Sequence, residues 1–518
     1  MRSSSTENII DLSPGVSIVL ATINAKYMHT SLALKYLKAN LEEFAPGARI
    51  LEFTLQERAA DIAEKILRQH PSIVLLSCYI WNISLTSEVV RIIRSVHPDI
   101  VLILGGPEVS FPTDQPDICK DVDHVICGEG ESILPAVLRG LSGPDTQEKN
   151  IIARPNDVAR IRFPYDLYTE EDISHRLVYV ESSRGCAFGC EFCLSSLDTK
   201  VRYFDNEQFI CQLEQLWNRG ARQFKFIDRT IHLSKASAIL DFFSTRICPE
   251  LFVHFEIVPD QITEQLVSAL RAFPPGAIQL EAGVQTFTPH VSTRIGRKQN
   301  MDKTEAALRK IVRETGVHIH SDLVIGLPGE TVETLAQSFN RLIHTGAHEI
   351  QVGVLKRLRG APISRHTDEY KMVYNESPPY EILQNRDISF ADMQRLKRFS
   401  RYFDLVSNNG NFQSTAPLIW QTNSPFTAFL RFSDWLYSEC GRTASIALDK
   451  LAEYIFDYLT LNDGFPKEQI ADCLRRDFVA NGRRKQPKCV REFASHEGIA
   501  YSENSSKGLP ERQQRHKQ

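Results

Sequence analysis

The chain has 518 residues, a formal net charge of -4 and 42% hydrophobic residues. The near-neutral balance argues against a large nucleic-acid footprint, and no run of about 18 apolar residues predicts a membrane span. The polar first 11 residues lack the apolar core of a secretory signal. Eight of the eleven cysteines are scattered, which suits a reducing cytoplasm. We therefore expect a cytoplasmic protein of about three domains.

The first 150 residues alternate predicted strands and helices. Strands are predicted at 16–21, 49–55, 72–77, 100–104 and 124–126, and helices at 31–44, 59–67 and 85–96. This alternation is typical of a doubly wound parallel sheet, and about five strands suit its flavodoxin-like form. We predict an α/β domain over residues 15–150 with a ligand site at the carboxyl ends of its strands.

Four loops follow these strands at one edge of the predicted sheet. None contains the glycine fingerprint of a dinucleotide site or a phosphate loop, so a nicotinamide or nucleoside triphosphate is not expected. Two loops are rich in glycine, which lets backbone amides approach a ligand. The candidate binding residues in the four loops are His29, Tyr79, Gly105, Gly106, Pro107, Gly128, Glu129 and Gly130.

A second series of strands and helices runs over residues 160–367. Strands are predicted at 177–182, 224–227, 252–257, 278–284, 317–325 and 349–354, with helices between them. Six such units predict a partial (β/α)6 TIM-like barrel rather than a closed barrel of eight. The active sites of these barrels lie at the carboxyl ends of the strands.

Three cysteines, Cys186, Cys190 and Cys193, follow the first of these strands with a spacing of four and three residues. Three thiolates on a 4Fe-4S cluster leave one iron open, as catalysis requires. The alternatives are half of a zinc site or three buried thiols. A zinc site needs a fourth ligand at paired spacing, and no such pair follows. The spacing therefore favours a cluster, with Phe192 beside it.

Polar residues gather at the same predicted edge. Buried carboxylates are costly unless they are paired or used. Here they could bind the hydroxyls and ammonium of a nucleoside–amino acid, or they could form internal ion pairs with Arg229 or Arg294. The candidates are Asp228, Glu256, Glu281, Gln285, Gly326, Pro328 and Gly329.

These motifs resemble a known superfamily. The pattern Cys-x-x-x-Cys-x-aromatic-Cys, with "LEAGVQTF" and "DLVIGLPGET", is similar to the radical S-adenosylmethionine superfamily. "NAKYMHTSLALKYL", "ILGGPEVS" and "VDHVICGEGES" resemble the cobalamin-binding domain that precedes the barrel in one branch. The resemblance implies three cofactors: a 4Fe-4S cluster on the three cysteines, S-adenosylmethionine and cobalamin.

The resemblance also implies residue roles. Phe192 would lie against adenine, Glu281 would face the ribose, and Gly326 to Gly329 would support the adenine side. The family's Gly-Gly-Glu motif is absent, and Asp228-Arg229-Thr230 stands in its place. His29 is not in the Asp-x-His-x-x-Gly pattern of a cobalt ligand, so no such ligand is assigned.

The implied activity is reductive cleavage of S-adenosylmethionine to a 5'-deoxyadenosyl radical. It would serve methylation or rearrangement of an unactivated carbon in a small-molecule substrate. The electron would come from an external reductant of the flavodoxin or ferredoxin type. Two alternatives stay open: a methylthiotransferase with a second cluster, for which Cys78, Cys119 and Cys127 are the N-terminal thiols, and a non-catalytic corrinoid or redox sensor.

The last third of the sequence is predicted to be mostly helical over residues 368–480. Helices are expected at 392–406, 426–438, 443–461 and 467–479. Aromatic residues recur there at helical spacing, which favours packing in a core. Residues 481–518 are polar and predict a mobile tail.

Overall fold

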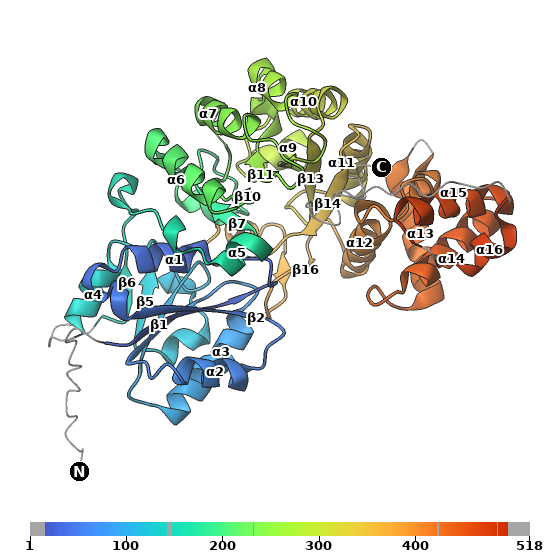
Figure 1. The fold of residues 1–518 in the computed structure, drawn as a ribbon. Helices are drawn as coiled ribbons and strands as arrows, with labels where there is room; N and C mark the ends of the chain where they lie inside the picture. The colour runs from blue at the N-terminus through green and yellow to red at the C-terminus, as the bar shows by residue number, and fades with distance from the viewer. Residues whose placement is uncertain (1–15, 142–147, 232, 422–423, 484, 496–518) are drawn as a thin grey trace, which may run out of the picture.

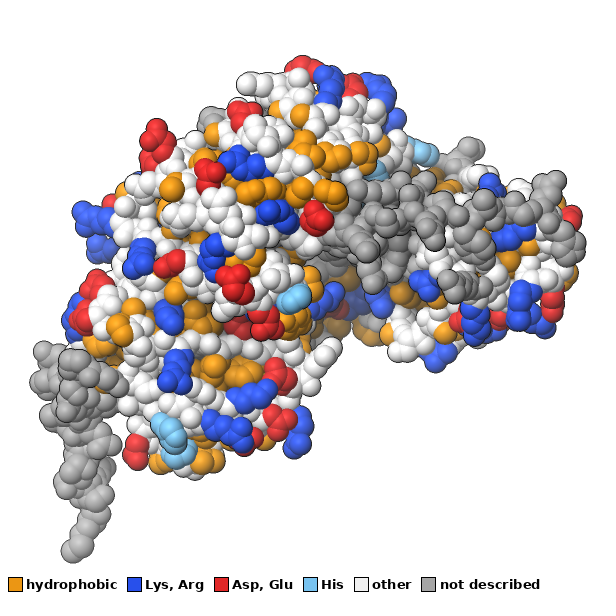
Figure 2. Space-filling model, in the orientation of Figure 1, with side chains coloured by type: hydrophobic (Ala, Val, Ile, Leu, Met, Phe, Trp, Pro, Cys, Tyr) orange, Lys and Arg blue, Asp and Glu red, His pale blue; other side chains and the backbone are white. Residues whose placement is uncertain are grey.

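The computed structural model describes residues 16–141, 148–231, 233–421, 424–483 and 485–495. Figure 1 shows an α/β unit with the barrel strands above it and a group of helices to one side. The face in Figure 2 carries interspersed positive and negative side chains. No described helix has the length and apolar character needed to cross a membrane. The first 11 residues, assessed above for a secretory signal, lie outside the described residues.

The N-terminal unit is a parallel sheet of six strands in the order β2-β1-β3-β4-β5-β6. The five predicted strands are present, and the short β6 adds to the edge beyond β5. Their buried apolar runs are typical of a sheet covered on both faces. The strands are β1 (Ile18–Asn24), β2 (Ala48–Thr54), β3 (Ile73–Ser77), β4 (Val101–Gly105), β5 (His124–Cys127) and β6 (Asn150–Ile152).

Four helices cover this sheet, two on each face. Helices α2 (Ala59–Leu67) and α3 (Ile83–Val96) pack on one face, and α1 (Leu32–Ala39) and α4 (Leu134–Gly140) pack on the other. This doubly wound arrangement confirms the predicted fold class. Helix α1 is shorter than predicted because it ends at Asn40 and a separate 3-10 helix covers Glu42–Gly47.

The second unit is an open barrel of six parallel strands in the order β14-β13-β12-β11-β10-β7. Strands β7 and β14 are its two edges and do not pair with each other, which confirms the predicted partial barrel. The strands are β7 (Val178–Val180), β10 (Gln223–Phe226), β11 (Phe252–Ile257), β12 (Ile278–Gln285), β13 (His318–Ile325) and β14 (Glu349–Val354).

Helices alternate with these strands as the sequence predicts. They are α6 (Asn206–Asn218), α7 (Leu233–Ser244), α8 (Glu264–Leu270), α9 (Pro289–Arg294), α10 (Met301–Glu314) and α11 (Val332–Ile343), and α5 (Glu170–His175) precedes the barrel. Side chains fix several helix starts. The Asp205 side chain caps α6, and Thr331 begins α11 with a capping box.

Two small hairpins were not predicted. One pairs β8 (Ser183–Arg184) with β9 (Arg202–Tyr203), and the other pairs β15 (Val373–Tyr374) with β16 (Ile382–Gln384). Strands of two or three residues carry too little periodicity to be recognised in a sequence. The first hairpin frames the cysteine loop, so it contributes directly to the site.

The C-terminal helices share one apolar core with the barrel. Phe399 and Phe403 of α12 (Phe390–Phe403) meet Phe339 of α11 edge to face, and so does Phe426 of α13 (Pro425–Cys440). The predicted role of the aromatic residues in packing holds for these side chains, which are buried. The helices are α12 (Phe390–Phe403), α13 (Pro425–Cys440), α14 (Leu448–Asp457), α15 (Lys467–Ala480) and α16 (Lys488–Phe493).

The predicted polar tail differs from the structure at its start. Helix α16 lies within it, packs on α15, and buries Cys489 and Val490. The fold therefore continues beyond residue 480. The mobility predicted for the end of the chain falls on residues 496–518, which lie outside the described residues.

Candidate functional site

The cysteine loop leaves the carboxyl end of β7 and is held by its own backbone. Gly185 has a φ of 85°, and a Cβ there would lie 2.4 Å from the Lys200 carbonyl oxygen. Only glycine fits this close turn. The Cys186 N–H donates to the Asp198 carbonyl at 2.9 Å, and the β8–β9 hairpin closes the base of the loop.

The three cysteines line one pocket of about 170 Å³ at the carboxyl edge of the barrel. Cys186 and Cys190 are buried and Cys193 is partly exposed. Burial raises the pKa of the Cys186 and Cys190 thiols. The Arg297 guanidinium donates to the Cys190 sulfur at 3.4 Å and opposes that rise. A cation beside a ligand thiol stabilises the thiolate that a metal requires.

The spacing of the thiols bears on the type of metal centre. Among the described residues, no three His, Cys, Asp or Glu side chains converge tightly enough to hold a single metal ion. Thiolates on one zinc ion would lie within about 4 Å of each other, given the Zn–S bond length. In a 4Fe-4S cluster each thiolate binds a different iron. The three thiols line one pocket, as thiolates that bind different irons of one cluster would.

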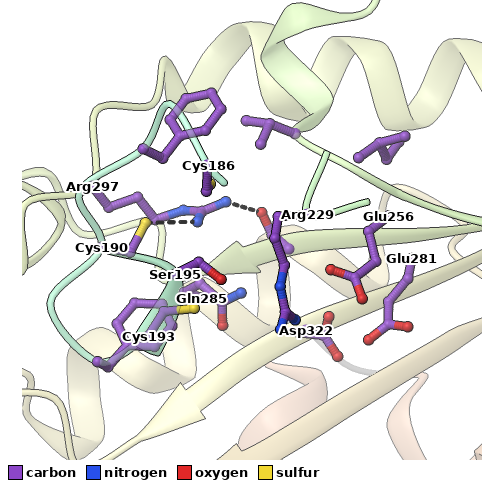
Figure 3. Close-up of a pocket in the computed structure, with 15 residues that line it drawn as sticks. Cys186, Cys190, Cys193, Ser195, Arg229, Glu256, Glu281, Gln285, Arg297 and Asp322 are labelled. Atoms are coloured by element: carbon purple, nitrogen blue, oxygen red, sulfur yellow. Dashed lines mark hydrogen bonds between the residues drawn. The ribbon is translucent and has the colours of Figure 1, made fainter. Parts of the chain in front are cut away.

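Three carboxylates line the opposite side of this pocket, on three neighbouring strands (Figure 3). Glu256 on β11 and Glu281 on β12 are register partners, and Asp322 on β13 is paired with Gly283. Figure 3 shows Arg229 between them and the cysteines. Burial, together with the nearby charge of Glu281, raises the pKa of Glu256 to about 7.

Glu281 is ionised in spite of its position. Burial alone would raise its pKa, but hydrogen bonding to His254 and the positive charge of Lys225 outweigh that effect and lower it. The His254 Nε2 lies 2.9 Å from a Glu281 oxygen. Burial lowers the pKa of His254, so the neutral ring donates its Nε2–H to the carboxylate.

Two other predicted residues, Phe192 and Gln285, also line the pocket. Gln285 has a φ of 70° at an irregularity in the β12–β13 pairing. Such strained positions are often found at functional sites. Asp322 and Arg297 also line the pocket and were not predicted from the sequence. Asp322 could have been found from the alternation of His318, His320 and Asp322 along one strand, whereas Arg297 lies in a loop with no such signal.

Four predicted residues lie outside the pocket lining. Asp228 is fully buried behind the cysteine loop, where it accepts bonds from the Ser182 N–H and from the Ser182 and Ser183 hydroxyls at 2.6–3.2 Å. Its carboxylate is satisfied there, so it supports the loop instead of facing a cofactor.

Gly326, Pro328 and Gly329 likewise pack against other parts of the chain. A Cβ on Gly326 would touch Ile382, the Gly329 N–H donates to Asp387, and Arg294 donates to the Pro328 carbonyl. The prediction that they support adenine therefore receives no support from their placement.

A second pocket, of about 410 Å³, lies at the carboxyl edge of the first sheet. All the predicted loop residues except His29 line it: Tyr79, Gly105, Gly106, Pro107, Gly128, Glu129 and Gly130. Gly106 has a φ of 102°, and a Cβ there would lie 2.5 Å from the Cys78 carbonyl oxygen. Leucine side chains of β3, β4 and α1 make the deep part of the pocket apolar.

His29 is placed differently from the prediction. Its Nδ1 lies 2.6 Å from the Tyr179 hydroxyl, at the contact between the sheet and the barrel. The loop that carries it turns toward β7 because the Arg176 guanidinium donates to the His29 carbonyl and pairs with Glu52. His29 therefore contributes to the domain contact instead of the pocket.

One arginine beside the cysteine loop lines the second pocket. Arg184, two residues before Cys186, lines the second pocket and pairs with Glu131 and Glu181, each at 2.8 Å. Burial raises the pKa of Glu181 to about 7 even though Arg184 lowers it. In the same hairpin, Arg202 pairs with Glu129 at 2.7 Å. The cysteine loop is thus bound to the loop that closes the second pocket.

The three N-terminal cysteines line neither of the two pockets. Cys78, Cys119 and Cys127 are buried, and burial raises the pKa of each thiol. Neither they nor any other described trio of His, Cys, Asp or Glu residues is placed to share one metal ion.

Comparison with known proteins identifies three regions. The model of the B12 binding domain matches residues 18–138, and the model of the radical SAM superfamily matches residues 180–342. A third model, described as a protein of unknown function (DUF4080), matches residues 368–517. The first region contains most of the residues that line the second pocket, and the second region contains the cysteine pocket.

Known proteins resemble the chain over much of its length. It is 27% identical to an uncharacterized methyltransferase of Pyrococcus horikoshii, over 58% of this chain and 70% of that protein. It is 25% identical to 2-(S-pantetheinyl)-carbapenam-3-carboxylate methyltransferase of Streptantibioticus cattleyicolor, over 60% of this chain and 50% of that protein.

The fold also matches a solved structure. The cobalamin-dependent S-adenosylmethionine radical enzyme OxsB superposes with a TM-score of 0.60 and 15% identity, covering 92% of this chain and 80% of that chain. At this identity the match shows the fold alone. Together with the domain matches, it confirms the resemblance recognised in the sequence: the chain combines a B12-binding domain with a radical SAM domain, as cobalamin-dependent radical SAM proteins do.

Proposed function

We propose that the protein is a cobalamin-dependent radical S-adenosylmethionine enzyme that methylates an unactivated carbon of a substrate. The observation that carries the proposal is the position of the two pockets. The cysteine pocket lies at the carboxyl edge of the barrel, and residues after β7 and β10 also line the pocket of the first sheet. Two matched relatives are methyltransferases, which favours methylation over rearrangement.

In this proposal Cys186, Cys190 and Cys193 hold the cluster, and S-adenosylmethionine lies between the cluster and Glu281. When bound and reduced, the cluster supplies the electron that cleaves S-adenosylmethionine to a 5'-deoxyadenosyl radical. Arg297 supports the thiolate of Cys190, and the ionised Glu281 accepts hydrogen bonds from the ribose hydroxyls. Phe192 and the buried barrel strands keep water from the reactive carbon.

The second pocket suits part of a corrinoid. Its apolar depth, formed by leucines and by Tyr36, would hold the aromatic nucleotide tail. Gly105 and Gly106 allow the backbone to approach the tail closely. The pocket contains no histidine in its lining, so we assign no protein ligand to cobalt. An external one-electron reductant of the flavodoxin or ferredoxin type would reduce the cluster.

Anaerobic reconstitution with iron, sulfide, cobalamin and S-adenosylmethionine tests this function. We expect about four irons per chain, at four per cluster, and formation of 5'-deoxyadenosine by the reduced protein. Cys190→Ala should lose 5'-deoxyadenosine formation, and Cys211→Ala, which alters an exposed thiol on α6, should retain it. About eight irons per chain would favour the methylthiotransferase alternative. Cobalamin binding without cleavage of S-adenosylmethionine would favour a sensor.

A further inference from the structure

A large groove follows the free edge of the barrel. It has a volume of about 880 Å³ and lies between residues 351–356, at β14, and helix α12, which contributes Ser400 and Arg401. Phe192 lines both this groove and the cysteine pocket. Phe192 therefore lies between the groove and the candidate active site.

The pairing of β14 fixes the direction of its backbone groups. The Leu355 N–H donates to the Ile325 carbonyl of β13 at 2.9 Å, and β13 and β14 are parallel and in register. In a parallel ladder, alternate residues direct both their N–H and C=O groups to the same side. Gly353 and Leu355 therefore face β13, while Ile350, Val352 and Val354 direct their groups toward α12.

Side chains already cover part of this edge. The Asn408 amide accepts from the Ile350 N–H at 3.0 Å and donates to the Ile350 carbonyl at 2.9 Å. The Ser400 hydroxyl donates to the Val352 carbonyl. Beyond the end of β14, β16 covers the edge, because the Ile382 N–H donates to the Leu355 carbonyl at 2.9 Å.

Some outward backbone groups of β14 are bonded neither to these side chains nor to β16. Within the described part of the chain, no hydrogen-bond partner is found for the Val352 N–H or for the N–H and C=O of Val354. Val352 is only 4% exposed, and buried backbone donors without a partner are rare in proteins. Because Ser400 occupies the Val352 carbonyl, Val354 is the residue that presents both an N–H and a C=O to an added strand.

We propose that this groove binds an extended peptide segment of the substrate, which adds to β14 as a further strand. The proposal rests on the proposed function and deepens it, because it assigns a peptide as the substrate class. Peptides commonly bind by adding a strand to an exposed sheet edge. A bound strand would satisfy the open N–H and C=O of Val354 and pass beside Phe192. Lys356, which is exposed and has no ion pair among the described residues, would lie at one end.

Selection from a library of random octapeptides with blocked, uncharged ends tests this inference on the reconstituted full-length protein. Val354→Pro removes the outward N–H and leaves the Gly353 and Leu355 bonds to β13 in place, because proline is tolerated on a strand edge. Val354→Ala is the matched control, since it shortens the side chain but keeps the N–H. We expect selected peptides to bind Val354→Pro about tenfold more weakly than Val354→Ala, as the loss of a buried hydrogen bond predicts.

The selected peptides provide a second measurement that does not depend on a variant. Each selected peptide is N-methylated in two versions, one at its odd-numbered and one at its even-numbered residues. One version should lose binding and the other should keep it, because a strand directs alternate N–H groups to opposite sides. The inference is overturned if no peptide is enriched over the bare support, or if neither methylated version of a peptide loses binding. It is also overturned if Val354→Pro and Val354→Ala have the same unfolding midpoint and bind the peptides equally well. Binding is measured without turnover, so absence of 5'-deoxyadenosine would contradict the proposed function without affecting this result.

Discussion

At the scale of single residues, the ionisation of Glu281 depends on one neighbour. His254 lies behind it on β11, is buried, and donates to its carboxylate at 2.9 Å. Without that donor, burial would dominate and the pKa of Glu281 would rise. A protonated Glu281 accepts hydrogen bonds from ribose hydroxyls less well than the carboxylate. The positioning role of His254 can therefore be separated from its packing by varying pH.

We expect His254→Leu to weaken the binding of S-adenosylmethionine about tenfold at pH 6, the value for losing one charge-assisted hydrogen bond. The loss should be smaller at pH 8, where Glu281 is again ionised. Equilibrium titration of the reconstituted protein with S-adenosylmethionine at both pH values measures this effect. The wild type, whose Glu281 pKa is already lowered, is the reference at each pH, so that the titration of Glu256, which both proteins share, does not enter the comparison.

His254→Gln provides the matched control, since its amide nitrogen can occupy the place of Nε2 and donate to Glu281. We expect this variant to restore most of the affinity at pH 6. If His254→Leu binds as tightly as the wild type at both pH values, His254 has only a packing role. Equal loss in both variants would show that the ring itself is needed.

At the scale of elements, the irregularity in β12 places a polar side chain in the pocket. The register with β13 shifts between Gly283 and Gln285, and Gln285 takes a φ of 70°. A β-bulge turns the side chain that follows it. The left-handed conformation costs a residue with a Cβ about 1 kcal/mol, so the fold gives up stability to bring Gln285 to the site.

We therefore expect Gln285→Gly to be more stable than Gln285→Ala by about 1 kcal/mol in free energy of unfolding. Both variants remove the side chain from the pocket, but only glycine relieves the backbone. Urea denaturation of the two variants measures the difference. Equal stability would mean that position 285 is not strained, and higher stability of the alanine variant would contradict the backbone conformation itself.

The sequence predicted elements well where the signal is local. The spacing of Cys186, Cys190 and Cys193 and the apolar runs of the strands depend on neighbouring residues, and the structure contains these features. Placement that depends on distant contacts could not be predicted. Asp228 turns to the serines of the preceding loop, and His29 turns to Tyr179. Arg297 reaches Cys190 across 107 positions of sequence.

At the scale of the whole molecule, the two sheets direct their ligand-binding edges toward each other. Arg359 binds Glu108 and Asp114 across the domain contact, at 2.9 Å each. Arg184 and Arg202 do the same beside the cysteine loop. These partly buried pairs fix the relative position of the two pockets, which a transfer reaction between two cofactor sites requires.

The fold also buries several carboxyl groups in the barrel and in the C-terminal helices. Burial raises the pKa of Glu181 and Glu256 to about 7, of Glu330 to about 8, and of Asp477 to about 6. In the unfolded chain these groups titrate near pH 4. Between pH 4 and 8 the folded state therefore holds more protons than the unfolded state, so stability falls as pH rises through this window.

Glu330 makes this effect testable. It is fully buried on the loop before α11, and the Thr286 hydroxyl donates to its Oε1 at 2.6 Å. Glu330→Gln keeps an acceptor for Thr286 but cannot ionise. We expect the variant to gain stability over the wild type as the pH rises. The difference in free energy of unfolding between the two proteins should be larger at pH 8.5 than at pH 5 by on the order of 3 kcal/mol, because each pKa unit corresponds to about 1.4 kcal/mol.

Urea denaturation at pH 5, 7 and 8.5 measures this difference between wild type and variant. Glu333→Gln is the control, because Glu333 lies on the exposed side of α11. Above pH 5 the free energy of unfolding of this variant should change with pH as it does in the wild type. The same slope for wild type and Glu330→Gln would contradict a protonated Glu330 in the folded protein. A slope that persists in part would assign the remainder to Glu181, Glu256 and Asp477, whose pKa values are raised less and which should lose their effect at lower pH than Glu330.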